Sequence, residues 1–142
     1  MNYFLDTNIC IYHLNNTYPS VHEKLMQTPT KTIKIPAMVA AELQYGAEKS
    51  NKRSFSKNVV STFLSVYQII PFDERAAEHY AIIRASLERE GKIIGGNDMI
   101  IAAIALSHRG ILVTHNTNEF SRIDGLVLED WVYQSTDPPK NR

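Results

Sequence analysis

The chain contains one cysteine, Cys10, among its 142 residues, so no disulfide can form within it. The absence of disulfides fits a reducing compartment, and we expect a cytoplasmic protein. No apolar run approaches the ~20 residues that a bilayer-spanning helix needs. The acid at Asp6 comes too early for a signal peptide. The sequence therefore predicts a soluble protein without a membrane partner.

Net charge is also absent, because 15 Lys and Arg residues balance 15 Asp and Glu residues. A neutral chain has no overall attraction to nucleic acid, so such a partner must be held by a local patch. Lys49, Lys52 and Arg53 form one basic cluster. A cluster of this kind is usually a solvated helix face, but it can also hold a phosphate backbone.

Two common signatures of ligand binding are missing. The chain has no glycine-rich phosphate loop of the Walker or dinucleotide type. Its histidines show no metal-ligand spacing, and only His115 lies in a candidate site cluster. These absences argue against nucleotide binding and against a zinc site.

Short apolar runs alternate with amphipathic segments along the whole chain. The runs predict strands at 3–5, 31–35, 67–72, 111–114 and 126–130. The segments between them predict helices at 6–14, 19–26, 37–50, 55–66, 74–90 and 97–109. We therefore expect one α/β domain over residues 1–133, with a mostly parallel central sheet and helices on its faces. Residues 134–142 are expected to form a polar, disordered tail.

Local signals refine some of these helices. Asp73 can cap the helix at 74–90, and Gly91 and Gly110 follow the ends of the last two helices. The segment 55–66 places five apolar side chains on one helix face, which are Phe55, Val59, Val60, Phe63 and Val66.

Polar clusters follow two of the predicted strands. Asp6, Thr7 and Asn8 follow the strand at 3–5, and residues 115–119 follow the strand at 111–114. Ligands of parallel α/β folds bind beyond the carboxyl ends of the strands. The two clusters are therefore candidates to share one crevice.

Four acids stand out, and each also has an ordinary structural explanation. Asp6 can cap the helix that follows it, and Asp98 can lie in the first turn of a helix that Asn97 caps. Glu42 has apolar neighbours at helical spacing, so it needs a partner such as an arginine or a metal ion. Glu119 can be an ordinary surface acid.

Carboxylates at strand ends, without histidine or cysteine ligands, favour Mg²⁺ or Mn²⁺ over zinc. Like charges gather in one crevice only when a cation is present. Such an ion can lower the pKa of a bound water and stabilise charge on a phosphoryl oxygen. The acids therefore predict hydrolysis of a phosphodiester or a phosphomonoester.

Five segments, in their order and spacing, resemble the PIN-domain ribonucleases of the VapC toxin type. They are FLDTNICIYHL at 4–14, AAELQYGAEKS at 40–50, GGNDMIIAAIAL at 95–106, ILVTHNTNEF at 111–120 and LEDW at 128–131. The resemblance covers residues 2–131. It implies a three-layer α/β/α sandwich and Mg²⁺-dependent endonucleolytic cleavage of RNA by a carboxylate cluster.

The resemblance also implies roles for individual residues. The metal ligands would be Asp6, Glu42 and Asp98. Thr7 and Asn8 would orient Asp6 or touch the scissile phosphate. A metal-activated water would attack the phosphorus and leave 5′-phosphate and 3′-hydroxyl ends.

A fourth corner of the site would come from Thr114, Asn116 and Glu119, with Asn97 in support. The sequence departs from the family here, because many relatives carry an acid in place of Asn116 or an aspartate in place of Glu119. Either residue can therefore complete the set of catalytic acids.

The resemblance further implies a homodimer and a cognate VapB-type antitoxin whose C-terminal segment inserts near the site. YGAEKS at 45–50 and EDW at 129–131 look most like members that cut initiator tRNA in the anticodon loop. Lys49, Lys52 and Arg53 would then contact this RNA.

Three alternatives stay open from the sequence. An Mg²⁺-dependent phosphatase would use Asp6 as its nucleophile, although Asn8 stands where such enzymes carry a second acid. A non-catalytic PIN-like binding module would keep the fold and act by contact. A nuclease outside toxin systems would process RNA, but the small size of the chain favours the toxin type.

Overall fold

A computed structural model of the chain describes residues 1–133. The tail predicted at 134–142 lies outside the described residues. A five-stranded sheet forms the centre of the structure. Its strands are β1 (Tyr3–Leu5), β2 (Ile33–Pro36), β3 (Gln68–Ile70), β4 (Ile111–Val113) and β5 (Val127–Glu129).

Neighbouring strands are all parallel, in the order β3-β2-β1-β4-β5. β1 lies in the middle, where Tyr3 pairs with Ile33 of β2 on one side and Ile111 of β4 on the other. Because the strands are parallel, their carboxyl ends all reach the same edge of the sheet. The predicted parallel sheet is confirmed.

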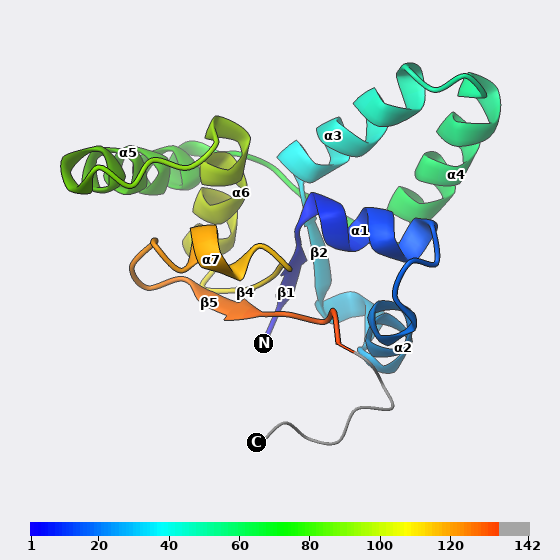
Figure 1. Ribbon diagram of the computed structural model, residues 1–142, viewed down its shortest axis with the longest axis horizontal. Helices are drawn as coiled ribbons and strands as arrows, with labels where there is room; N and C mark the ends of the chain where they lie inside the picture. Colours follow the sequence, from blue (N-terminus) through cyan, green and yellow to red (C-terminus); the bar gives the residue numbers. More distant parts are fainter. Residues whose placement is uncertain (134–142) are drawn as a thin grey trace.

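Helices cover both faces of this sheet. They are α1 (Thr7–Leu14), α2 (Pro19–Gln27), α3 (Ala37–Glu48), α4 (Arg53–Ser65), α5 (Glu74–Glu90), α6 (Gly96–Ser107) and α7 (Thr117–Phe120), with a short 3₁₀ turn, η1 (Thr30–Thr32). Figure 1 shows α5 and α6 on one side and α1 and α2 on the other, with α3 and α4 as a projecting hairpin. The fold is the expected three-layer α/β/α sandwich. None of the helices in the described part of the chain combines the length and apolar character needed to cross a bilayer.

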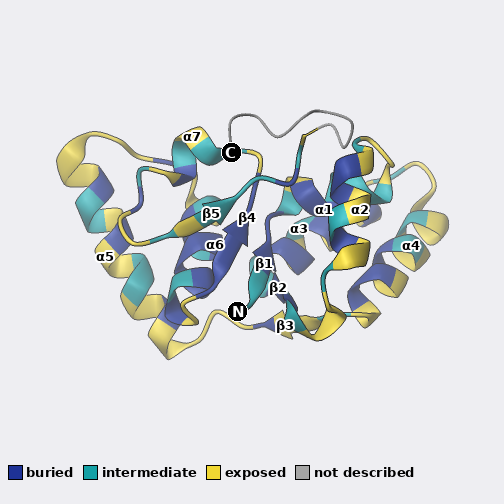
Figure 2. Cartoon of the chain, turned by 90° about the horizontal axis from the view of Figure 1, so that it is seen from below, coloured by how far each residue is buried: buried dark blue, intermediate teal, exposed yellow. Residues whose placement is uncertain are grey.

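The hydrophobic core lies between these layers. Phe4 of β1 and Leu112 of β4 are fully buried, as is every residue from 101 to 105 of α6. Helix α6 packs against α5 and contacts β2 and β4, which explains why it is apolar on nearly every side. Figure 2 shows the buried residues on β4 and on the inward faces of the helices.

The apolar face predicted for residues 55–66 is partly wrong. Phe55 and Val66 of α4 are 67% and 54% exposed, whereas Val60 and Phe63 are buried. Helical spacing places all these side chains within one broad stripe, but α4 packs against α3 along only part of it. The strand predicted at 31–35 also begins later, because residues 30–32 form a 3₁₀ turn.

The expected helix ends are mostly confirmed. The Asp73 side chain accepts a hydrogen bond from the Ala76 backbone N–H at 3.0 Å, and Gly91 adopts a left-handed φ of +68°. Gly110 follows α6, but Arg109 takes the positive φ of +53° there. Gly110 is needed for space, since a Cβ on it would lie 2.3 Å from the Phe4 ring.

Candidate active site

Asp6 lies where β1 ends and α1 begins, and it is almost fully buried. Its Oδ1 accepts a hydrogen bond from the Thr7 backbone N–H at 2.8 Å, so the predicted helix cap is confirmed. Its Oδ2 accepts a second hydrogen bond from the Thr114 hydroxyl, also at 2.8 Å. Because β1 and β4 are neighbours, the two polar clusters meet at one edge of the sheet, as expected.

Glu42 lies on α3 and is half-buried. Its Oε1 accepts a hydrogen bond from the Thr7 hydroxyl, and its Oε2 accepts one from the Asn97 side-chain amide at 3.2 Å. Within residues 1–133, no lysine or arginine forms an ion pair with Glu42, so the expected alternative of an arginine partner is not observed. The apolar surroundings expected for Glu42 are also incomplete, because Ala41 and Tyr45 beside it are exposed.

Helix α6 begins differently from the prediction. Gly95 is its N-cap, and Asn97 lies inside the first turn. The Asn97 amide is turned to Glu42 instead of to the helix backbone, so the predicted capping role is wrong. A hydrogen bond to an ionised carboxylate is stronger than a neutral cap bond, and Gly95 leaves the first backbone N–H groups of the helix open.

Asp98 follows Asn97 and is half-buried in the same first turn. The pKa of its carboxyl is about 6, well above the ordinary value of 3.8, and burial is the largest cause. The other causes are the negative charges of Asp6, Glu119 and Glu42. Since charge–charge interactions weaken with distance, these contributions place the other three acids near Asp98.

The fourth corner is built by the segment that follows β4. The Asn116 backbone N–H donates to the Thr114 hydroxyl at 2.9 Å, and the Asn116 side-chain amide donates to Glu119 Oε1. The Thr114 hydroxyl therefore donates one hydrogen bond, to Asp6, and accepts another, from Asn116. The two open candidates, Asn116 and Glu119, are therefore joined by a hydrogen bond.

The sequence of residues 3–126 matches the model of one family, the PIN domain. This chain belongs to the PIN-domain family. It is 42% identical to ribonuclease VapC2 of Rickettsia felis over 132 residues, which are 92% of this chain and 98% of that protein. It is 40% identical to the tRNA(fMet)-specific endonuclease VapC of Shigella flexneri, over 92% of this chain and 98% of that protein.

Chains with a similar fold occur in solved structures of VapBC complexes. A VapBC complex of Salmonella typhimurium bound to DNA contains a chain with a TM-score of 0.88 and 37% identity, covering 92% of this chain and 98% of that one. VapBC2 of Rickettsia felis, bound to a DNA fragment from its promoter, contains a chain with a TM-score of 0.84 and 42% identity. The match covers 92% of this chain and 99% of that one. The family resemblance of the sequence and the expected fold are both confirmed.

Asp6 of this PIN domain, like Asp98, has a carboxyl pKa above its ordinary value. Burial raises the pKa of Asp6 above its ordinary value, and Glu42 raises it further, against the hydrogen bonds from Thr114 and Thr7 that lower it. A raised carboxyl pKa means that the ionised form is disfavoured. A cation at this point would relieve the repulsion.

The donors present fit a hard cation, because they are carboxylate, hydroxyl and amide oxygens. Within residues 1–133, no three His, Cys, Asp or Glu side chains are already arranged to hold a metal ion. Both oxygens of Glu42 are engaged, by Thr7 and by Asn97. Each carboxylate oxygen can accept more than one contact, so Glu42 could hold an ion and keep these hydrogen bonds.

The remaining candidates lie outside this hydrogen-bond network. Asn8 is exposed on α1, and no hydrogen bond of its side chain is found within residues 1–133. His115 is the one histidine in the predicted cluster. Its Nδ1 lies 2.9 Å from Asp130 Oδ2, and it pairs with none of the four candidate acids. Lys52 and Arg53 are exposed at the turn between α3 and α4.

Sequence reasoning missed the exposed ring of Tyr45, which lies one turn beyond Glu42 on α3. Lys49 lies with its Nζ 4.9 Å from the centre of that ring. The spacing of a basic residue four positions after an aromatic one was the available signal, because residues four apart are neighbours on a helix.

Proposed function

We propose that this PIN domain is an Mg²⁺-dependent endoribonuclease toxin of a toxin–antitoxin pair. The observation that supports it most is the raised pKa of Asp98, about 6, which burial causes first and the charges of Asp6, Glu119 and Glu42 increase further. Relatives with 40% identity or more are named as a ribonuclease and as a tRNA endonuclease. The chain spans nearly their whole length.

Asp6, Glu42 and Asp98 are the proposed ligands of Mg²⁺, with Mn²⁺ as a substitute. When bound, the ion would polarise water and stabilise negative charge on the phosphoryl oxygens. Thr114 and the Thr7 backbone hold Asp6 in one orientation, and Asn97 holds Glu42. Such fixed ligands reduce the reorganisation that the reaction requires.

Glu119, oriented by Asn116, is the proposed acceptor of the proton that water loses as it attacks the phosphorus. The bond between phosphorus and the 3′-oxygen breaks, and the leaving 3′-oxygen takes up a proton. The products would carry 5′-phosphate and 3′-hydroxyl ends. The mechanism requires no covalent intermediate with Asp6.

The proposed substrate is tRNA, in particular the anticodon loop of initiator tRNA. VapC proteins of Shigella flexneri and Salmonella typhimurium, at 40% and 37% identity, are named tRNA(fMet)-specific endonucleases. Lys49, Lys52 and Arg53 are exposed and would contact the phosphate backbone.

A VapB-type antitoxin is the proposed protein partner, since several of the matching structures are VapBC complexes. We also propose a homodimer and a cytoplasmic location. A short gene for such an antitoxin beside the gene for this chain would support the toxin assignment over a role in RNA processing.

The test is a cleavage assay on purified, antitoxin-free protein with total bacterial tRNA and Mg²⁺. Asp6→Ala, Asp98→Asn and an EDTA control should each leave the tRNA intact. Asp124→Asn, which removes an exposed acid that is not among the charges acting on Asp6 or Asp98, is the matched control and should cleave like the wild type. Wild-type protein that leaves both tRNA and ribosomal RNA intact would overturn the proposal in favour of a binding module.

A further inference from the structure

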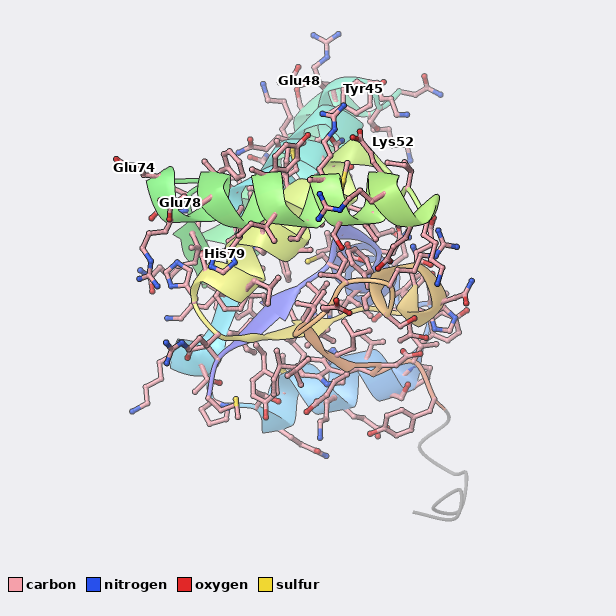
Figure 3. The ribbon with its side chains drawn as sticks, turned by 90° about the vertical axis from the view of Figure 1, so that its left-hand side faces the viewer. Tyr45, Glu48, Lys52, Glu74, Glu78 and His79 are labelled. Carbon is pink, nitrogen blue, oxygen red and sulfur yellow. The ribbon has the colours of Figure 1, made fainter. Side chains whose placement is uncertain are left out.

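Tyr45 presents an aromatic ring to solvent beside the acidic cluster. The residue is 64% exposed, whereas Leu43 and Ala47 on the opposite side of α3 are buried. Tyr45 follows Glu42 by three positions, so the two side chains lie on the same side of α3, ~4.5 Å apart along its axis. Figure 3 shows Tyr45 with Glu48 and Lys52 at the end of the α3–α4 hairpin, beyond α5.

Positive charge surrounds this ring. The Lys49 Nζ lies 4.9 Å from the ring centre, within the range of a cation–π contact. Between residues 45 and 57 the chain carries four basic residues and a single acid, Glu48, which is engaged by Lys57 at 2.8 Å. The chain as a whole is neutral, so this end of the hairpin is the kind of local patch that an RNA partner requires.

RNA binding needs such a patch, because the acids themselves repel a polyanion. Asp6, Glu42, Asp98 and Glu119 concentrate negative charge where the scissile phosphate has to lie. Affinity must therefore come from groups beside them. Proteins that hold single-stranded nucleic acid combine a basic surface with aromatic rings on which bases stack.

We propose that Tyr45 is the stacking residue for an unpaired base next to the cleavage site, with Lys49 contacting the adjoining phosphate. The inference rests on the proposed ribonuclease function and adds a specificity-determining residue to it. A stacked base requires an unpaired nucleotide, so Tyr45 selects loops and single strands over duplex RNA. Tyr45 positions the strand and takes no part in the chemical step.

The first test measures binding without cleavage. A fluorescently labelled single-stranded RNA that carries the sequence cut by the wild type is titrated with the full chain in EDTA, and anisotropy is recorded. Tyr45→Ala should weaken binding by about 5- to 100-fold, which corresponds to the loss of one stacked base. Tyr45→Phe keeps the ring and should bind like the wild type. Ile82→Ala, a change at another exposed apolar residue (67% exposed, on α5), is the matched control and should have no effect.

The second test locates the base. RNA probes that each lack one base are compared between the wild type and Tyr45→Ala. One abasic position should weaken binding to the wild type and leave binding to Tyr45→Ala unchanged, because the stacking interaction is already absent. Light scattering on both proteins checks whether the substitution changes their oligomeric state.

Two results would overturn the inference. One is wild-type affinity in Tyr45→Ala; the other is a loss of affinity that accompanies dissociation into monomers, which would mean that a second copy of the chain covers Tyr45. If the wild type cleaves RNA in either case, the proposed function stands and only the role of Tyr45 fails. If the wild type neither binds nor cleaves RNA, both fail.

Discussion

The Thr114 hydroxyl donates a hydrogen bond to Asp6 Oδ2 at 2.8 Å across neighbouring strands, although the two residues are 108 positions apart in sequence. Thr114 is fully buried, and its oxygen also accepts the Asn116 backbone N–H. This one side chain therefore joins the two halves of the candidate active site.

Thr114→Val should impair both stability and cleavage. Valine keeps the shape but leaves Asp6 Oδ2 and the Asn116 N–H each without a partner, which should cost about 1–3 kcal/mol of unfolding free energy in urea. The pKa of Asp6 should also rise further, so protons would compete better with Mg²⁺. Thr114→Ser retains the hydroxyl and should keep most of both properties. Wild-type stability in Thr114→Val would show that the hydrogen bond is unimportant.

Asp98→Asn should stabilise the metal-free protein while it abolishes cleavage. The Asp98 pKa is about 6 in the folded protein, so the unfolded chain loses this proton at lower pH. The unfolding free energy of the wild type should therefore fall as the pH rises from about 4 to about 6. The destabilisation by the ionised Asp98 carboxylate should persist at neutral pH. Since Asp98 is partly exposed, we expect a gain on the order of 1 kcal/mol at neutral pH. Urea unfolding in EDTA at several pH values measures it; a less stable Asp98→Asn at neutral pH would contradict the expected repulsion.

Mg²⁺ should raise the melting temperature of the wild type at neutral pH. An ion that binds only the folded state stabilises it by about 2.7 kcal/mol at a hundredfold excess over its Kd. The rise should shrink below pH ~6, because protonation of Asp98 then competes with the ion. Asp124→Asn should respond to Mg²⁺ like the wild type, and Asp6→Ala should not. An equal response in Asp6→Ala would place the ion elsewhere.

Gly110→Ala and Gly46→Ala should change stability in opposite directions. A Cβ at Gly110 would meet the Phe4 ring at 2.3 Å in a fully buried part of the core, so we expect a loss of about 1–3 kcal/mol. A Cβ at Gly46 meets no atom within 4 Å, and alanine favours the helix α3 by about 0.5–1 kcal/mol. Thermal unfolding of both variants is the measurement, and a stable Gly110→Ala would mean that Phe4 can shift.

The elements of the fold were predictable where one local cause dominates. β1 and β4 are short apolar runs because both of their faces are covered, and α5 is bounded by its own capping residues, Asp73 and Gly91. The exposure of Phe55 was not predictable, because helical spacing says which side chains share a face but not how much of that face a neighbour covers.

The candidate site was predictable as a set of residues but not as a set of contacts. The chemistry of the acids indicated a shared cation, and the family resemblance selected them. Their hydrogen bonds depend on which strands are neighbours, and Thr7 meets Glu42 only because α1 and α3 pack together. For the same reason Asn97, which looks like a helix cap in the sequence, instead contacts a carboxylate 55 positions away.

The ends of the cleaved RNA test the central claim most directly. Fragments from tRNA incubated with the wild type and Mg²⁺ should carry 5′-phosphate and 3′-hydroxyl ends, and Asp98→Asn should yield no fragments. Such ends require attack by water at a site that stabilises the leaving 3′-oxygen. Fragments with 2′,3′-cyclic phosphate ends, formed equally well in EDTA, would mean that the RNA attacks itself and that the four acids do not act as proposed.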